Sequence, residues 1–456
     1  MHIWARTIAL AASLLAASAA SAASATANIG VNVLLDSAPT SAILADLGRF
    51  GRVRDVVEEI RAVTMQTTAD RLPDIRALPH VVSAGPDAER KGGPIDTVTA
   101  TDFAGGINTW DLDAVNVTDF GGGRVVPFDG AGVYVAVLDT GLLDSWRQYF
   151  PEQRIATQFA VAFGGGGGEV GSVSTQPNKW EHDQHSHGTH VTSTILGYSL
   201  RGAPVNGVAP LATVVPVKVL NQNGSGWSSV VARGIVHVAD LKASGAFGGS
   251  PVVINMSLGG PVLDAMEKAA IDYAISQGVL VVASAGNEGT AGMGFPGAYA
   301  PVISVAASGW VGEWAPPGNR GWWNNRNVAD PTNPDDFYIT DFSSRQLAGQ
   351  DLDVAAPGSW VVGPFQLQSG KTSYFFLGGT SMASPHVAGI VALMAQKFPA
   401  LGQVQAEQIL TGTAIALPRG CRTVAQPAGP PAEFCWDGDA TGAGLVTADA
   451  ALAATP

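Results

Sequence analysis

The sequence predicts an α/β protein with a mostly parallel central sheet, preceded by a small α+β domain. Two observations support this prediction. From residue 110 onward, short apolar runs of strand length alternate with longer runs of helical periodicity, which is typical of a parallel sheet covered by helices on both faces. Before residue 91, strand-like and helix-like segments instead follow one another in the order β-α-β-β-α-β.

Length and composition limit the classes of protein to be considered. A chain of 456 residues exceeds one ordinary domain, and 46% hydrophobic residues suffice for a large core. The chain has 25 Lys and Arg against 38 Asp and Glu, which gives a formal net charge of −13. A protein with this acidic balance lacks the basic surface that binds phosphates, so we expect no nucleic-acid partner.

Residues 1–25 have the pattern of a secretory signal peptide. The segment carries a positive charge at Arg6, continues through the apolar run 7–20, and ends in the small residues 23–25 (Ala-Ser-Ala) of a cleavage pattern. This run is too short to span a bilayer, and no later run is long enough either. We therefore expect a secreted protein, extracellular or periplasmic, without a membrane span.

A small domain of ferredoxin-like order is expected at residues 26–90. Strand-like alternation and helical spacing succeed one another in five segments: 30–36, 39–50, 52–67, 69–78 and 81–84. The charged, Gly-containing stretch 87–93 is typical of a linker. We expect a processing linker over 91–109 and a large domain over 110–456.

The large domain shows five buried strand patterns and five helical patterns. The strands are expected at 133–138, 213–220, 252–256, 280–284 and 302–306, and the helices at 190–196, 228–243, 262–277, 384–397 and 403–411. Residues 310–341, with four tryptophans, form an insertion too long for an ordinary connection. It could line a ligand cleft or pack on the surface, and both alternatives stay open.

Cys421 and Cys435 are the only two cysteines. In an exported chain we expect them to form a disulfide, which would close a loop of about 15 residues and stabilise the fold by roughly 3 kcal/mol on the chain-entropy model. The alternative is two independent buried thiols.

Asp139 ends the apolar strand pattern 133–138. Polar groups at the carboxyl ends of strands in open α/β sheets face the crevice where ligands bind. Asp139 is therefore a candidate for a buried carboxylate that orients a histidine. The alternative is an aspartate that only caps the turn before Gly141.

His187 lies at the start of a predicted helix, after a polar loop. A neutral imidazole is the usual general base for a serine hydroxyl. His182 and Asp183 nearby suggest a metal site as the alternative, but the spacing matches neither H-E-x-x-H nor a Cys/His zinc cluster. We therefore expect no metal at this site.

Ser381 lies in the Gly-rich turn 379–389, which opens an apolar helical run. A hydroxyl at a helix N-terminus lies among unpaired backbone N–H groups that favour negative charge, as an acyl-transfer nucleophile requires. Pro385 suits the first helical turn, where its missing N–H has no cost. The alternative is a serine that serves only as an N-cap.

The order Asp139, His187, Ser381 and the sequence around each residue resemble the subtilisin-like serine proteases (the subtilase family). The matching blocks are 137–141 (Val-Leu-Asp-Thr-Gly), 187–191 (His-Gly-Thr-His-Val) and 379–389 (Gly-Thr-Ser-Met-Ala-Ser-Pro-His-Val-Ala-Gly). The resemblance implies a subtilisin-like three-layer fold, hydrolysis of peptide bonds through an acyl-enzyme, and an Asp-His-Ser triad. It also implies that Asn287, in the block Ala285-Gly286-Asn287, donates to the oxyanion.

The resemblance further implies a set of substrate-binding residues. They are Ser257, Leu258, Gly259 and Gly260 on one side of the cleft, Gly226 and Trp227 on the other, Ala285 and Gly286 in the oxyanion block, and Gly294 at the floor of the P1 pocket. The absence of a side chain at Gly294 predicts an open, apolar pocket.

Residues 26–90 resemble the family's propeptide, a folding template and intramolecular inhibitor that the enzyme removes itself. We expect a monomer that acts on polypeptides and needs no cofactor for its chemistry. The segment 198–207, where many family members bind calcium, has few oxygen-bearing side chains, so a structural calcium site is left open without a location. Two alternatives remain: a secreted esterase, although the G-x-S-x-G motif is absent, and a catalytically silent peptide-binding relative.

Overall fold

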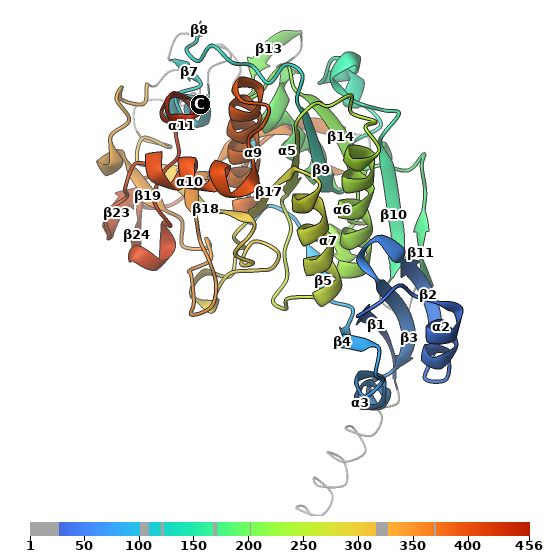
Figure 1. Cartoon of the computed structure of the whole chain (residues 1–456). Coiled ribbons are helices and arrows are strands. Elements are labelled where there is room, and N and C mark those ends of the chain that lie inside the picture. The colour runs from blue at the N-terminus through green and yellow to red at the C-terminus, as the bar shows by residue number, and fades with distance from the viewer. Residues whose placement is uncertain are drawn as a thin grey trace, which may run out of the picture.

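A mostly parallel sheet of nine strands forms the centre of the larger part of the molecule (Figure 1). The computed structural model describes residues 27–100, 109–119, 123–166, 171–200, 202–315, 327–368 and 371–456, so the expected signal peptide lies outside the described residues. The strands are β9 (Tyr134–Asp139), β10 (Val161–Gly166), β11 (Gly171–Thr175), β14 (Thr213–Lys218), β16 (Val252–Met256), β17 (Val279–Ser284), β18 (Ile303–Trp310), β19 (Phe337–Ile339) and β20 (Val354–Pro357).

The strand order is β11-β10-β14-β9-β16-β17-β18-β19, with β20 also paired to β18. The inner pairs are parallel, and the outer pairs β10–β11 and β18–β19 are antiparallel. Parallel strands with helices on both faces are buried on both sides, which explains why β16 and β17 are unbroken apolar runs apart from Asn255 and Ser284.

Helices cover both faces of this sheet, as the sequence predicts. They are α4 (Trp110–Ala114), α5 (His187–Leu196), α6 (Ser228–Ala243), α7 (Ala265–Ser276), α9 (Thr380–Lys397), α10 (Gln403–Thr413) and α11 (Ala448–Ala454). Figure 1 shows α6 and α7 side by side. Along β9, Val135 and Val137 pack in the core that contains α5 and α9, whereas Ala136 and Leu138 pack in the core of α6 and α7. The fold therefore has three layers.

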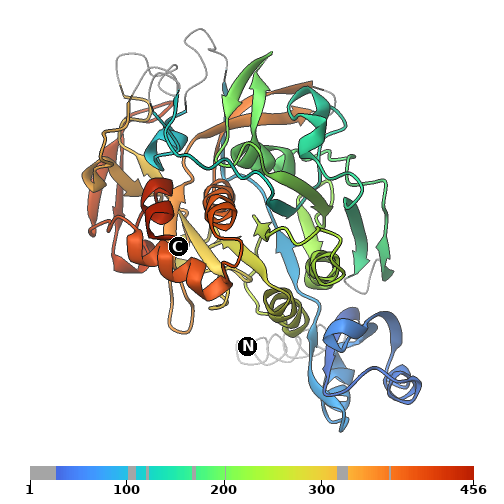
Figure 2. The same ribbon diagram turned by 45° about the horizontal axis from the view of Figure 1, so that its top comes forward.

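A smaller four-stranded sheet precedes the large one. It consists of β1 (Asn28–Leu35), α2 (Ser41–Gly48), β2 (Arg52–Val57), β3 (Ala62–Thr68), α3 (Leu72–Arg76) and β4 (Val81–Pro86), and its antiparallel strands lie in the order β2-β3-β1-β4. The sequence predicts the same order of elements. Both views show this unit (blue) beside α7 (Figures 1 and 2).

The segment expected to be a linker contributes to two strands, with residues 92–95 as the connection between them. β5 (Glu89–Lys91) pairs with β15 (Ser225–Trp227), and β6 (Asp96–Ala100) pairs with β22 (Lys371–Gly378), whose other neighbour is β21 (Val361–Gln368). Residues 101–108 lie outside the described part. The local sequence of the expected linker is typical of a loop. Its strands could not be predicted from that sequence because their partner strands lie more than 100 residues away in the chain.

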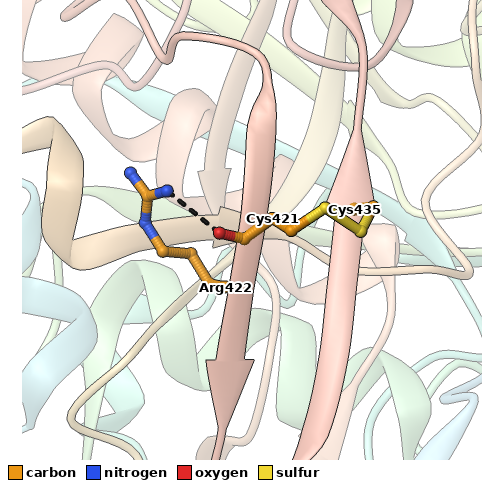
Figure 3. The surroundings of a disulfide bond; sticks show 3 residues. All are labelled: Cys421, Arg422 and Cys435. Atoms are coloured by element: carbon orange, nitrogen blue, oxygen red, sulfur yellow. Dashed lines mark hydrogen bonds between the residues drawn. A yellow bond between two sulfur atoms is a disulfide. The ribbon is translucent and has the colours of Figure 1, made fainter.

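The remaining strands form short antiparallel pairs: β7 (Thr118–Asp119) with β8 (Gly123–Arg124), β12 (Gly197–Leu200) with β13 (Ala203–Asn206), and β23 (Gly420–Val424) with β24 (Ala432–Trp436). The last pair carries the predicted disulfide, Cys421–Cys435, with an S–S distance of 2.05 Å (Figure 3). In the described part of the chain, no helix is both long and apolar enough to cross a membrane.

Candidate active site

Asp139 and His187 meet at the carboxyl edge of the central sheet. Asp139 is the last residue of β9 and His187 the first of α5, and neither side chain is exposed to solvent. His187 Nδ1 lies 2.8 Å from Asp139 Oδ1 and 3.0 Å from Oδ2. A carboxylate can only accept, so Nδ1 carries the proton and Nε2 is left with a free lone pair. This is the tautomer that a general base needs.

Backbone and hydroxyl groups hold this pair in place. The backbone N–H of Thr140 donates to Asp139 Oδ1 at 2.7 Å, and the Thr140 hydroxyl accepts from the N–H of Gly188 at 2.9 Å. A Cβ on Gly188 would lie 2.4 Å from the carbonyl oxygen of Gly141, so the residue after His187 has to be glycine for the helix to approach the strand this closely.

Asp183, the carboxylate of the alternative metal site, belongs to the same scaffold. It accepts from the Thr140 hydroxyl at 2.9 Å and from the N–H of His185 at 2.8 Å. Burial raises the pKa of Asp183 to about 6, against the opposing effect of Lys218. Burial also lowers the pKa of His185 to about 4, with a smaller contribution from His187. His185 is therefore neutral at pH 7.

Ser381 lies in the first turn of α9, one residue after the helix begins at Thr380. The helix thus starts earlier than the sequence predicts, and the expectation that Pro385 lies in the first turn is wrong, because Pro385 is inside the helix. Pro385 has no N–H to donate to the carbonyl of Ser381. The hydroxyl of Ser257 donates to that carbonyl instead, at 2.9 Å, which explains how the helix tolerates an interior proline.

The Ser381 hydroxyl donates to the carbonyl oxygen of Ser257 at 3.2 Å. Within the described residues, His187 Nε2 has no hydrogen-bond partner. The serine–histidine hydrogen bond that a triad uses is therefore not formed in this conformation.

Asn287 follows β17, and its amide is oriented by Thr380. Its Oδ1 accepts from both the backbone N–H and the hydroxyl of Thr380, each at 2.9 Å. With Oδ1 occupied in this way, the Nδ2 amino group is the part of the side chain left for a ligand. Asn287 and Ser381 line one cavity of about 370 Å³.

The structure brings four of the nine predicted substrate-binding residues to this cavity. Leu258, Gly259, Gly286 and Gly294 line it together with Ser381 and Asn287. The other predicted residues take other positions: Gly226 and Trp227 line a neighbouring cavity of about 350 Å³, Ala285 is fully buried, Ser257 binds Ser381, and Gly260 pairs with Phe295.

A segment of the chain itself runs through the cleft as a strand. Lys91 exchanges two backbone hydrogen bonds with Gly259, at 2.9 and 2.8 Å, and the N–H of Gly92 donates to the carbonyl of Gly224 at 2.9 Å. Beyond Ser381, the N–H of Ile95 donates to the carbonyl of Gly378 at 2.6 Å. Gly93 and Pro94, between these anchors, line the same cavity as Ser381 and Asn287.

The described part of the Trp-rich insertion reaches the same region. Tyr338 and Asp341 line a cavity of about 670 Å³ that also includes Asn287 and Ile95. These residues favour the alternative in which the insertion lines a ligand cleft over the alternative in which it packs on the surface. Residues 316–326 lie outside the described part.

Two groups of described residues bring three potential metal-ligand atoms within 4.8 Å of one another. One is Cys421, Glu433 and Cys435, whose thiols are already joined in the disulfide. The other is Asp113, Asp119 and Asp330, where burial raises the pKa of Asp113 to about 7. Neither group includes His182, Asp183 or His187.

Several residues that hold the site residues in place were not predicted from the sequence. Thr140 and Thr380 each stand directly beside a predicted site residue, and that adjacency is the signal that could have identified them. Asn255 has no such signal: it accepts from Ser384 at 2.7 Å and donates to Ser257 at 3.0 Å, and only the packing of β16 against α9 brings these side chains together.

Comparison with known proteins finds relatives over most of the chain. Residues 130–438 match the model of the subtilase family. The chain is 35% identical over 294 residues to subtilisin DY of Bacillus licheniformis, covering 64% of this chain and 86% of that protein. It is 30% identical over 360 residues to a thermostable alkaline protease of Halalkalibacterium halodurans, covering 79% of each.

The fold also resembles a crystal structure of fervidolysin from Fervidobacterium pennivorans, a keratinolytic enzyme related to subtilisin. The TM-score is 0.64 at 24% identity, over 94% of this chain and 62% of that one. At this identity the likeness concerns the fold alone.

Proposed function

The chain belongs to the subtilase family of serine endopeptidases, and from this premise we propose that Asp139, His187 and Ser381 carry out peptide-bond hydrolysis. The observation that carries the proposal is the buried Asp139–His187 pair beside a cleft that holds an extended polypeptide segment next to Ser381.

In the proposed mechanism the Ser381 hydroxyl turns from the Ser257 carbonyl to His187 Nε2. His187 then takes the proton as Ser381 Oγ attacks the carbonyl carbon of the substrate, while Asp139 stabilises the imidazolium. The oxyanion accepts from Asn287 Nδ2 and from the backbone N–H of Ser381. His187 passes the proton to the leaving nitrogen, and water hydrolyses the acyl-enzyme.

We further propose that the protein is exported as a precursor in which residues 26–90 are the propeptide. The signal-peptide pattern of 1–25 and the disulfide support export, because disulfides persist in oxidising compartments. The strand β5 in the cleft supports intramolecular inhibition, since a substrate cannot occupy the same hydrogen-bonding positions.

The test is the Ser381→Ala precursor, expressed in a protease-free host beside Ser276→Ala, an exposed serine on α7, as the matched control. We expect Ser381→Ala to fold, to remain full-length and to cleave no casein, whereas the control matures and cleaves casein. Full maturation of Ser381→Ala in that host would contradict the proposal.

One observation favours a second candidate, a silent peptide-binding relative: Ser381 Oγ contacts Ser257 and not His187. A fluorophosphonate separates the two candidates, because it labels only a serine that is activated by its base. Labelling of the mature protein at Ser381 supports the protease, and binding of peptides without labelling supports the silent relative.

A further inference from the structure

The side chain of Arg90, on the strand in the cleft, is completely buried against Glu267 of α7. Arg90 Nε lies 3.0 and 3.1 Å from the two carboxylate oxygens of Glu267, and Nη2 also contacts that carboxylate. Nη2 donates to the carbonyl of Val262 at 3.1 Å as well. Both side chains are 0% exposed. In Figure 1, β5 lies next to α7.

The surroundings of Glu267 are shaped for this contact. A Cβ on Gly260 would lie 3.0 Å from Arg90 Nη1 and 2.3 Å from the carbonyl oxygen of Glu89, so the absence of a side chain at residue 260 opens the path. Glu267 lies in the first turn of α7, where the helix dipole favours a carboxylate.

Glu267 has a single cationic neighbour in the described part of the chain. The charged groups that act on it there are Arg90, Asp264 and Asp87, and the last two are acidic. If Arg90 leaves with the rest of its strand, Glu267 stays at the bottom of the vacated space. No other cationic side chain in the described part of the chain is then next to it. A buried carboxylate without a partner is unfavourable, so the site selects a cation.

The hydrogen-bond register fixes which substrate residue would replace Arg90. Lys91 pairs with Gly259, Gly92 with Gly224 and Ile95 with Gly378, which places the Gly93–Pro94 bond at Ser381. Arg90 is the fourth residue before that bond.

We infer that Glu267 forms the floor of a substrate-binding subsite for an arginine side chain at the fourth residue before the cleaved bond. The inference rests on the proposed function, because it requires substrates to take the place of β5. A guanidinium matches the carboxylate with two parallel hydrogen bonds. Lysine offers only a point charge, leucine leaves Glu267 unpaired, and glutamate repels it.

The experiment uses the mature enzyme and four internally quenched peptides that differ only at this residue, which is Arg, Lys, Leu or Glu. We expect kcat/KM to follow the order Arg, Lys, Leu, Glu, with Arg about tenfold or more above Leu. The matched control is Asp272→Asn, an exposed carboxylate on the same helix, which should keep this order.

Glu267→Leu alone would leave the Arg90 charge buried without a partner in the precursor. The variant is therefore the double substitution Arg90→Leu and Glu267→Leu, which replaces the buried ion pair by a pair of apolar side chains. Its mature form should prefer Leu to Arg. Equal kcat/KM for Arg and Leu peptides with the wild type, or a double variant that still prefers Arg, would overturn the inference. Cleavage of none of the peptides by the wild type would overturn the proposed function, and the inference with it.

Discussion

Glu313, in the insertion, is a buried carboxyl group that can make the stability of the fold depend on pH. Its carboxylate is fully buried and accepts from the backbone N–H of Trp310 and the Ser359 hydroxyl, each at 2.9 Å, and from the Tyr338 hydroxyl at 3.2 Å. Burial raises its pKa from the ordinary 4.5 to about 8, despite these three donors. At neutral pH the native protein therefore holds Glu313 protonated.

When folding raises the pKa of a group, the protonated group stabilises the folded state. This stabilisation is complete at pH values below the pKa of the group in the unfolded chain, and it is lost as the pH rises through the pKa of the group in the folded protein. For Glu313 the loss extends from about pH 4.5 to about pH 8. We expect Glu313→Gln, which cannot ionise, to remove this slope. The free energy of unfolding of the variant relative to the wild type should thus rise by a few kcal/mol, in order of magnitude, between pH 5 and 9.

Urea unfolding of both proteins at several pH values measures this difference directly. Asp113 and Asp353 also have raised pKa values, but both proteins retain them, so their contribution cancels in the comparison. A constant difference between pH 5 and 9 would show that Glu313 does not titrate in this range.

At the scale of single residues, Asp139, His187, Ser381 and Asn287 could be singled out because each stands in a short local motif. The structure pairs Asp139 with His187 and brings Ser381 and Asn287 to one cavity. The contact of Ser381 with Ser257 could not be predicted. It depends on Pro385, which frees one carbonyl, and on β16, which brings Ser257 to that carbonyl. Such contacts follow from packing between distant elements and leave no local pattern.

At the scale of elements, the strand in the cleft presents an unusual bond to Ser381. Pro94 supplies the nitrogen of that bond, and its ring occupies the place of the amide hydrogen. In the proposed mechanism His187 delivers a proton to this nitrogen as the bond breaks, and the ring carbon of the proline would crowd that approach. General acid catalysis contributes about 10²–10⁴-fold, so crowding this step slows cleavage substantially.

We therefore expect Pro94→Ala to speed conversion of the precursor by about tenfold or more. The measurement is the time course of conversion on gels, with N-terminal sequencing to locate the new terminus at residue 94. Pro86→Ala, at the end of β4 and outside the cleft, is the control and should convert at the wild-type rate. A Pro94→Ala precursor that converts no faster, or a terminus elsewhere, would show that another bond is cut first.

The elements differ in how well they could be predicted. The strands β16 and β17 are apolar runs of strand length and the helices α6 and α7 have helical periodicity, so the sequence locates these elements closely. β5 and β6 do not, because Gly92, Gly93 and Pro94 between them are typical of a loop. Their strand conformation comes from hydrogen bonds to β15, to Gly259 and to β22.

At the scale of the whole molecule, an acidic cluster joins the start of the large domain to the insertion. Asp113, Asp119 and Asp330 each place an oxygen within 4.8 Å of the others, and the N–H of Val328 donates to Asp113 at 2.9 Å. Asp113 is 4% exposed, and its Oδ1 has no hydrogen-bond partner among the described residues. Calcium–oxygen distances are about 2.3–2.6 Å, so one ion can reach oxygens this far apart.

We expect calcium to raise the Tm of the wild type and a chelator to lower it. At a free concentration of 100 times Kd the stabilisation is about 2.7 kcal/mol. Asp330→Asn, an exposed position, should weaken this response, and Asp335→Asn, an exposed aspartate outside the cluster, should retain it. Calorimetry of each protein with calcium and with chelator measures this change in Tm. Equal changes in the two variants would exclude the cluster as the calcium site.

The presence of β5 in the cleft also has a kinetic consequence. The strand and the serine it approaches belong to one chain, so their encounter depends on the tether and not on how many molecules are present. If the precursor converts itself as proposed, we expect its first conversion to be a first-order process whose half-time is unchanged by dilution. Cleavage of one molecule by another should instead slow in proportion as the protein is diluted.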